Sequence, residues 1–366
     1  MNAGRLIAVA RKEWIQLRRD PRSMILAFVL PVLMVLFFSY AITWDLDDIP
    51  LAVVDQERTA ESRALVERFS ASGYFSVQRV LDRVPEAERV LVRGEVRAVL
   101  VIPPGFTAAL HGSGPSPVQF LLDGGDANTA TVALTYAEVV AAGFGVPAAA
   151  RPPITLDTRI WYNETLRSRN MIVPGLVAVI MSIIAAMLTA LTIAREWERG
   201  TMEQLAATPV RRTEVVIGKI LPYLAIGLFD VALVVLTGVL LLGVPFRGDL
   251  VLLVVLTIFF LLGALGLGTF ISAALKSQVL ATQVAMVATY LPALLLSGFM
   301  FAIANMPPVL KAFTWVVPAR YYVSVTRSIF LKGAGIGDLW PEALAMILFA
   351  TIGIALAVRA FRKEIA

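Results

Sequence analysis

Long apolar stretches constrain this chain more than any other feature of its sequence. Asp230 is the only charged residue inside six apolar runs, which cover residues 24–42, 171–194, 220–244, 250–275, 279–303 and 343–358. A helix needs about 20 apolar residues to cross a hydrocarbon core of about 30 Å. Only 16% of the residues are charged, against about 25% in an average soluble domain. The sequence therefore predicts an α-helical polytopic membrane protein with six transmembrane helices.

Basic residues predict which side of the membrane each loop faces. They lie at the N-terminus, between the second and third runs, after the fourth run and after the last. The positive-inside rule then places both termini in the cytoplasm, and it accounts for the net charge of +5 without a nucleic-acid partner. One loop disagrees, because residues 304–340 fall outside on this topology yet carry Lys311, Arg320, Arg327 and Lys332.

Residues 1–22 predict an amphipathic interfacial helix that precedes a first transmembrane helix over residues 23–43. Apolar side chains recur on one face at helical spacing: Leu6, Ile7, Ala10, Trp14 and Leu17. Basic residues dominate the rest of this segment, and such a helix lies along a membrane with its basic side toward anionic head groups. Pro31 is expected to kink the helix that follows.

Residues 44–168 have the pattern of a water-soluble α/β domain. Short β-branched runs predict strands, and polar, alternating segments between them predict helices. The expected strands are 51–54, 75–81, 96–102, 118–122 and 154–162, and the expected helices are 59–70, a segment from Pro85, and 128–142. Because the first span starts inside, this domain is expected to be extracytoplasmic. Residues 169–366 then form a five-helix transmembrane region.

Composition and motifs argue against several kinds of chemistry in this chain. There is no cysteine and one histidine, which disfavours disulfides and histidine-based metal sites. Gly218-Lys219 is followed by Ile220 and lacks the upstream glycine of a phosphate-binding loop. Gly263, Gly266 and Gly268 lie inside an apolar run, where small residues let helices approach closely. No catalytic residue, metal or bound cofactor is therefore expected.

Asp230 is the one acidic residue well inside a predicted span. An ionisable group at that depth is a functional candidate by default, and a proton-coupled carrier uses such carboxylates. Coupling normally involves several partnered ionisable groups, and only one is found here. A polar contact between helices, or a position lining a wet cavity, explains Asp230 equally well.

Residues 195–207 predict a short charged helix in the cytoplasm. Thr201 and Gln204 have capping-box spacing, which predicts a helix start. Thr208-Pro209 is expected to end that helix and to begin the next, with proline in its first turn. On pattern alone, a cytoplasmic loop that happens to be helical is the simpler interpretation.

Three groups of motifs resemble the permeases of ABC-2 type exporters. The first spans Glu196-x-x-x-Gly200-Thr201-x-Glu203-Gln204-Leu205, Thr208-Pro209-Val210 and Gly218-Lys219-x-Leu221-Pro222-Tyr223. The second is Asn170-Met-Ile-Val-Pro174-Gly175, at the start of the second span. The third is Ser297-Gly298-Phe299-x-Phe301, Asn305-Met-Pro-Pro308, Pro318-x-Arg320-Tyr321-Tyr322 and Arg327-x-x-Phe330-Leu331-Lys332-Gly333. They occur in the family's order, so the resemblance covers nearly the whole chain.

The resemblance implies a type-2 ABC exporter permease fold and a role for each part. The short cytoplasmic helix would dock into a groove of a separate ABC ATPase, which carries the ATP–Mg. The implied ATPase-coupling residues are Arg195, Glu196, Glu198, Arg199, Gly200, Thr201, Glu203 and Gln204. Glu196, Glu198 and Glu203 would suit ion pairs across that contact. Residues 304–340 would form a re-entrant segment that dips into the outer leaflet, among membrane lipids.

The same resemblance implies how the chain assembles and where it works. Two permease chains are expected per transporter, as a homodimer or a heterodimer with a homologue. The large domain after the first span resembles bacterial inner-membrane exporters that often work with a periplasmic adaptor protein.

We therefore expect a non-enzymatic permease subunit that moves an amphipathic or lipid-like substrate, such as a drug or a lipid, out of the cell. Two alternatives remain open: a proton-coupled secondary transporter that uses Asp230, and a non-transporting membrane receptor or scaffold.

Overall fold

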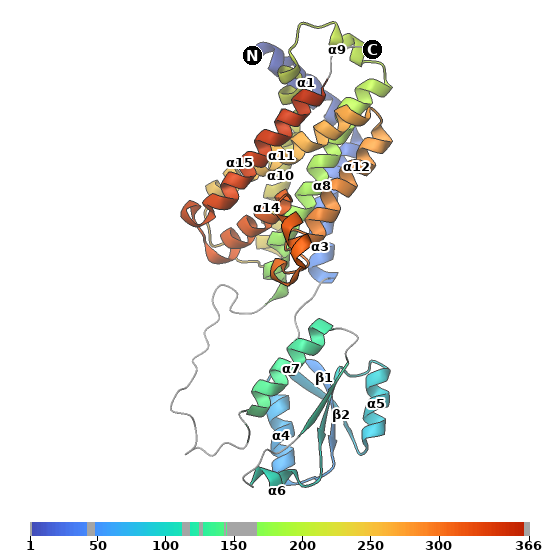
Figure 1. Ribbon diagram of the computed structural model, residues 1–366, viewed down its shortest axis with the longest axis vertical. Helices are drawn as coiled ribbons and strands as arrows, with labels where there is room; N and C mark the ends of the chain where they lie inside the picture. The colour runs from blue at the N-terminus through green and yellow to red at the C-terminus, as the bar shows by residue number, and fades with distance from the viewer. Residues whose placement is uncertain are drawn as a thin grey trace. The chain divides into compact units, whose positions relative to one another are not determined.

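The chain divides into two compact units in a computed structural model (Figure 1). The first unit contains Met1–Thr43 and Ile160–Ala366, and the second contains Trp44–Arg159. The structure describes residues 2–41, 48–111, 118–123, 127–142, 144 and 167–361. The strand expected at 154–162 lies outside the described residues.

A four-stranded sheet organises the second unit. Its strands are β1 (Ile49–Asp55), β2 (Phe75–Leu81), β3 (Ala98–Ile102) and β4 (Gln119–Leu122), in the order β2-β1-β3-β4. β1 pairs in parallel with both of its neighbours, and β4 runs antiparallel to β3. The central strands β1 and β3 are almost entirely buried. They can be continuous apolar runs because helices cover both faces.

Helices cover the two faces of this sheet and create two separate apolar cores (Figure 1). The helices are α4 (Ala60–Ala71), α5 (Val84–Val92), α6 (Phe106–Leu110) and α7 (Ala127–Ala142). Alternate residues of β1 point to opposite faces. Leu51 belongs to the core shared with α4, α6 and α7, whereas Val54 belongs to the core shared with α5. The Thr59 hydroxyl caps α4 by accepting a hydrogen bond from the Ser62 amide.

The regular elements of the first unit are all helices within the part of the chain that the structure describes. It begins with α1 (Ala3–Arg18), α2 (Pro21–Met24), the π-turn η1 (Ile25–Val29) and α3 (Leu30–Ala41), and continues after the second unit with α8 (Ser168–Glu198) and α9 (Met202–Ala206). Next come α10 (Arg212–Leu236), η3 (Thr237–Leu241), α11 (Leu250–Leu275), α12 (Gln278–Leu295) and η4 (Ile303–Asn305). The last elements are α13 (Pro308–Thr314), α14 (Pro318–Arg327), η5 (Ser328–Lys332) and α15 (Ile336–Ala360).

Five helices of the described chain are long and apolar enough to cross a membrane: α8, α10 continued by η3, α11, α12 and α15. The predicted first span is helical over Pro21–Ala41, but η1 interrupts it. Pro31 explains this interruption, because its ring nitrogen cannot donate to the carbonyl of Ala27 and its ring crowds that carbonyl. The Leu30 amide accordingly donates to the Ile25 carbonyl, five residues back.

Two other predicted spans end differently in the structure. The fifth was expected over 279–303, but α12 stops at Leu295, and the chain then turns at Gly298, which has a φ of 82°. The last was expected over 343–358, but α15 already begins at Ile336. Its first turns follow Gly333, which has a φ of 66°. Residues 336–340 therefore belong to the last long helix rather than to the segment before it.

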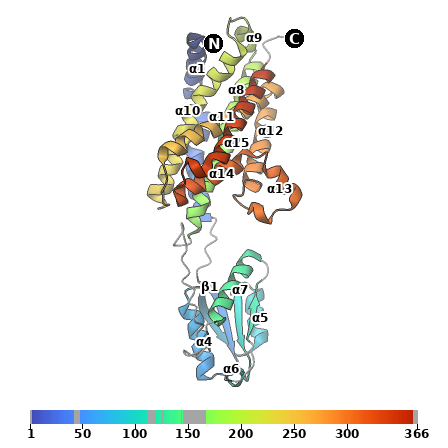
Figure 2. The same cartoon turned by 60° about the vertical axis from the view of Figure 1, so that its left-hand side comes forward.

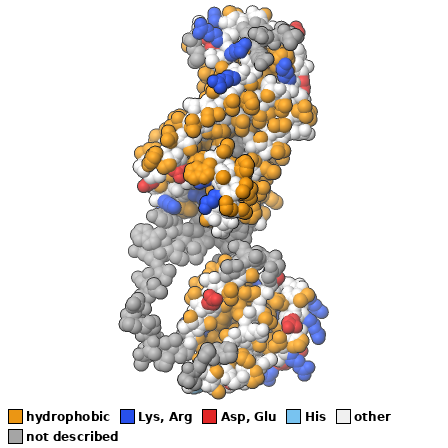
Figure 3. All heavy atoms as spheres, viewed as in Figure 1, with side chains coloured by type: hydrophobic (Ala, Val, Ile, Leu, Met, Phe, Trp, Pro, Cys, Tyr) orange, Lys and Arg blue, Asp and Glu red, His pale blue; other side chains and the backbone are white. Residues whose placement is uncertain are grey.

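α8 is the central helix of the first unit. Its most apolar stretch is 89% buried, whereas that of α12 is 22% buried. Glycines permit close approach of neighbouring helices, as the sequence indicated for Gly263, Gly266 and Gly268. A methyl group on Gly266 would lie 2.6 Å from the carbonyl carbon of Gly353 in α15, and one on Gly268 would meet Ala186 of α8. Apolar side chains cover the middle of this unit, and lysine and arginine gather at the end that carries α1 and α9 (Figure 3).

Replacing Gly266 with alanine should lower the thermal unfolding temperature of the purified chain in detergent. The added methyl group meets the backbone of α15, which cannot rotate away, so we expect a loss of about 1–3 kcal/mol. Gly337→Ala is the matched control, because a methyl group there meets no atom within 4 Å and alanine favours helix. Equal unfolding temperatures for the two variants would contradict close backbone packing of α11 on α15.

Candidate functional site

The connection between α8 and α10 is a turn, a short helix and a loop. Arg195 to Glu198 form the last turn of α8, and α9 begins only at Met202. This corrects the expectation of one coupling helix over residues 195–207. The break lies at Gly200, whose φ of 68° is left-handed and cannot continue a right-handed helix. Glu203 and Gln204 are exposed on α9, whereas Met202 is buried beneath it.

The predicted ends of the short helix are confirmed, because Thr201 is the N-cap residue of α9 and α9 ends at Ala206, before Thr208-Pro209. The predicted side-chain cap and the predicted start of the next helix are wrong. The Thr201 side chain does not cap α9, and its hydroxyl donates to the Glu196 carbonyl oxygen at 3.4 Å instead. Pro209 lies in the loop, because α10 starts at Arg212. Glu214 makes the capping interaction there: its carboxylate accepts from the Arg211 amide at 2.9 Å.

A buried group of opposite charges joins three helices beside α9. The Lys219 ammonium of α10 lies 2.5 Å from a Glu13 oxygen of α1 and 3.1 Å from a Glu196 oxygen of α8. Lys219, Glu13 and Glu196 are at most 3% exposed. Lys12 of α1 lies 2.5 Å from the same Glu196 oxygen, but its side chain is 51% exposed. We call these four residues the charge cluster.

Other contacts hold α1 along α10, and the two helices lie side by side in both views (Figures 1 and 2). The second Glu214 oxygen accepts from the Asn2 amide at 2.7 Å, and Arg5 donates to the Pro209 carbonyl at 2.6 Å. Gly218 permits this packing, because a methyl group there would lie 2.9 Å from Cβ of Val9. The buried face of α1 is therefore Val9, Glu13 and Leu17. Ile7 and Trp14, which the sequence assigned to the apolar face, are 62% and 42% exposed.

The remaining predicted site residues are tied to neighbouring helices. Glu198 accepts from the backbone amide of Gln278 at 2.7 Å and so caps the start of α12. Arg195 forms an ion pair with Asp20 at 3.1 Å. Arg199 is exposed and follows the last residue of α8. Three acidic residues were proposed to face a partner. Glu196 and Glu198 have partners within this molecule, whereas Glu203 is exposed and its side chain has no ion pair or hydrogen bond among the described residues.

Asp230 lies in the middle of α10 and is 0% exposed. Both of its carboxylate oxygens lack a hydrogen-bond partner in the described part of the chain. A buried carboxyl group without a cation is strongly disfavoured in its charged form. Asp230 therefore takes no part in the charge cluster.

The other matched motifs meet at the opposite end of the bundle. Arg327 of α14 donates to the carbonyls of Gly298 at 2.9 Å, Phe299 at 3.2 Å and Met171 at 3.3 Å. The Phe299 ring lies against Gly175 of α8, where any side chain would meet it. One guanidinium thus fastens α14 to the start of α8 and to the turn after α12. The sequence grouped these residues only as motifs and did not predict that they touch.

Sequence reasoning overlooked Glu13 and Lys219 as partners. The signal for Glu13 was a single acidic residue on a basic helix, four residues from both Val9 and Leu17 and therefore on the same face as these apolar residues. Lys219 was interpreted from the sequence only as a basic loop residue and as part of the Gly218-Lys219 motif. Their pairing joins residues 206 positions apart, so no local pattern could have predicted it.

Comparisons with known proteins identify transporter permeases as relatives of this chain. The family model described as ABC-2 family transporter protein matches residues 21–359. The probable multidrug ABC transporter permease YbhS of Escherichia coli K12 is 37% identical over 336 residues, which is 90% of this chain and 89% of that protein. The probable multidrug ABC transporter permease YbhR of the same strain is 30% identical over 99% of both chains. The linearmycin resistance permease protein LnrN of Bacillus subtilis is 22% identical over 98% of this chain and 99% of that protein.

Replacing Lys219 with methionine should destabilise the chain strongly. Glu13 and Glu196 would then be buried together without their shared cation, and breaking a buried pair in this way costs about 3–5 kcal/mol. Thermal unfolding followed by tryptophan fluorescence in detergent measures the effect.

Lys12→Met is the matched control for Lys219→Met. Its ammonium is half exposed and Glu196 keeps Lys219, so we expect a loss of about 1 kcal/mol or less. Adding Glu13→Gln to Lys219→Met should recover part of the stability, because one uncompensated charge disappears. Similar unfolding temperatures for the two single variants would show that the charge cluster does not hold the helices together.

Proposed function

The chain belongs to the ABC-2 family of transporter proteins, and from this premise we propose that it is the permease subunit of an ATP-driven exporter. Membership implies an ATPase partner and pairing with a second permease chain. In this proposal the separate ATPase binds and hydrolyses ATP–Mg. The permease moves an amphipathic or lipid-like substrate, such as a drug or a lipid. The names of its relatives as multidrug permeases support that substrate class.

The position of α9 beside the charge cluster is the observation that carries this proposal. α9 presents Glu203 and Gln204 to solvent, where a partner protein can reach them. The turn before α9 follows directly on the last turn of α8, which holds Glu196. Glu196 contacts Lys219 of α10, and Lys219 contacts Glu13 of α1.

A push or pull on α9 would therefore act on three helices together. Separating the buried charges would leave one of them unpaired in an apolar surrounding, which is strongly unfavourable. The helices are thus expected to move as one body when the ATPase closes, rather than to slide past each other. Because Glu196 and Glu198 are engaged inside the chain, we assign the direct contact with the ATPase to α9.

We place this subunit in the bacterial inner membrane with six spans, Pro21–Ala41 being the first. Both termini and α9 are cytoplasmic in this topology, and the α/β unit is extracytoplasmic. α13 and α14 form the re-entrant segment, which Arg327 fastens to the start of α8. The basic side chains of that segment then face lipid head groups. A periplasmic adaptor protein is a candidate partner of the α/β unit.

The pairing of two permease chains, alike or homologous, is consistent with the exposed apolar helices. α12 and α15 bury only 22% and 28% of their most apolar stretches within one chain. The rest must face lipid or another protein in a membrane. In this proposal the substrate pathway lies between two chains, because most of the central helix α8 is buried within one bundle.

A second candidate function is proton-coupled transport through Asp230. The observation that favours it is complete burial of a carboxyl group with no hydrogen-bond partner among the described residues. A third reading, a receptor or scaffold that acts through its α/β unit, requires that residues 195–207 be dispensable for function.

Reversing the charge of Glu203 should uncouple the permease from its ATPase. Glu203→Lys is expected to reduce co-purification with the ATPase encoded beside it and to remove the effect of the permease on ATP turnover. Stability should be unchanged, because Glu203 is exposed. Glu67→Lys makes the same change at an exposed position of α4, and it should leave both readouts intact. A complex that forms equally well with both variants would show that α9 is not the docking element.

Asp230→Asn should preserve ATP-driven export. The amide has nearly the same shape as the carboxyl group but cannot take up or release a proton as that group can. Transport driven by ATP alone should therefore be unaffected. Export is measured in inverted membrane vesicles with ATP, and separately with an imposed proton gradient alone. Export that follows the proton gradient without ATPase, and that disappears in Asp230→Asn, would favour the proton-coupled carrier.

A further inference from the structure

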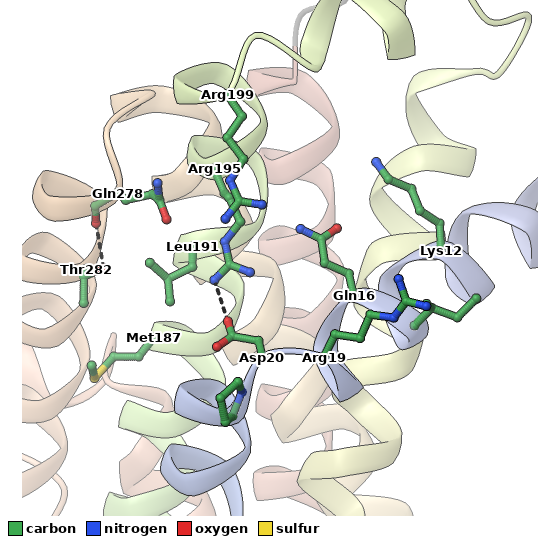
Figure 4. A pocket seen from close by; sticks show the side chains of 12 residues that line it. Lys12, Gln16, Arg19, Asp20, Met187, Leu191, Arg195, Arg199, Gln278 and Thr282 are labelled. Carbon is green, nitrogen blue, oxygen red and sulfur yellow. Dashed lines mark hydrogen bonds and ion pairs between the residues drawn. The ribbon is translucent and has the colours of Figure 1, made fainter.

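A basic hollow lies at the end of the bundle that carries α1, between α1, α8 and α12 (Figure 4). Its volume is about 900 Å³. α1 and the turn after it contribute Lys12, Ile15, Gln16, Arg19, Asp20 and Pro21; α8 and α12 contribute Met187, Leu191, Arg195, Arg199, Gln278 and Thr282. The Arg195 and Arg199 side chains extend along α8 into this space, and Gln16 and Gln278 face them from the neighbouring helices (Figure 4).

The hollow has more positive than negative charge. Four basic side chains line it, and Asp20 is the only acidic one. Asp20 is engaged by Arg195, and Lys12 is engaged by Glu196 of the charge cluster. Arg19 and Arg199 have no carboxylate partner in the described part of the chain. Like charges concentrated in a concave site attract an anion, and planar guanidinium groups match the oxygens of a phosphate.

The wall of the hollow is apolar where α8 enters its long apolar run. Ile15, Met187 and Leu191 line this part, and Arg195 is the first charged residue after the run. α1 beside it exposes Ile7 and Trp14 as well as Ile15. Exposed apolar side chains interleaved with basic ones are typical of helices at a membrane surface. A ligand that fits both parts has an acidic head and an apolar tail.

We propose that this hollow binds the phosphate head group of an anionic membrane lipid. Arg199 and Arg19 contact the phosphate, and the acyl chains lie along Met187 and Leu191. Through Arg195 and Lys12, the lipid head adjoins the residues that hold α1 to α8. The hollow adjoins α9, because Arg199 and Gln204 line a neighbouring pocket together, but lipid binding at this site does not require an ATPase.

Lipid binding to the purified full-length chain tests the site. The chain in a non-ionic detergent is titrated with dioctanoyl phosphatidylglycerol and, separately, with dioctanoyl phosphatidylcholine, and native mass spectrometry counts the bound lipids. We expect one phosphatidylglycerol to bind at least about tenfold more tightly than phosphatidylcholine. Equal binding of the two lipids would overturn the proposal.

Two double variants separate the hollow from general surface charge. Arg19→Gln with Arg199→Gln removes the two arginines without a carboxylate partner and should abolish the preference for phosphatidylglycerol. Arg18→Gln with Arg359→Gln removes the same charge from exposed residues at the same end of the bundle that do not line the hollow, and it should keep the preference. An equal loss in both variants would assign the preference to surface electrostatics and contradict the site. Matching unfolding temperatures verify that both variants fold.

Two further measurements distinguish a lipid phosphate from a soluble phosphate. Inorganic phosphate should displace phosphatidylglycerol poorly, because it lacks the tail, and Leu191→Asn should weaken lipid binding. Efficient displacement by inorganic phosphate with no effect of Leu191→Asn would indicate a soluble phosphate ester instead of a lipid. Loss of ATPase binding in Arg19→Gln with Arg199→Gln, with lipid binding unchanged, would make the hollow a protein-docking groove. The lipid titrations use neither ATP nor an ATPase, so their outcome is independent of the test of Glu203.

Discussion

The contact of Lys219 with two buried carboxylates is the interaction on which the arrangement of this molecule depends. Lys219, Glu13 and Glu196 come from three different helices and are nearly inaccessible to water. Taking charges out of water is unfavourable, and their attraction offsets this only in a close arrangement. Well-packed apolar side chains of similar volume could replace the whole group at little cost in stability. We infer that the charges instead favour one register of the three helices, because a small shift would leave one charge unpaired.

Backbone proximity makes this cluster possible. α1 can reach Lys219 only because Gly218 and Val9 pack almost without a gap. Close packing at glycine also occurs deeper in the bundle, where Gly266 lies against Gly353 and Gly268 lies against Ala186. At the far end, Gly175 admits the Phe299 ring beneath Arg327. Small residues thus set the distances between helices, and a few charged groups set their register.

Charged side chains have different kinds of partner at the two ends of the bundle. At the end with α1 and α9, opposite charges are paired within the chain, and an excess of arginine lines the hollow beside them. At the other end, Arg327 has carbonyl groups as partners rather than a carboxylate. Carbonyl dipoles satisfy its hydrogen bonds without cancelling its charge. The carbonyl contacts of Arg327 hold the turn after α12 firmly in place. The end with α1 and α9 instead presents an exposed helix to a partner and, as proposed, a site for an anion.

The apolar runs by themselves determined that this is a helical membrane protein, because runs of that length have few other solutions. Local patterns also located most elements: α11 has the expected bounds, and β2 does as well. Ordered motifs indicated the family. Local patterns failed where a backbone turn overrode them, at Gly200 and Gly298, and where Pro31 disrupted helical hydrogen bonding. Tertiary structure alone decided that Glu196 pairs with Lys219 inside the chain while Glu203 stays exposed. Both are glutamates in one charged segment, and only the position of α1 and α10, far away in sequence, distinguishes them.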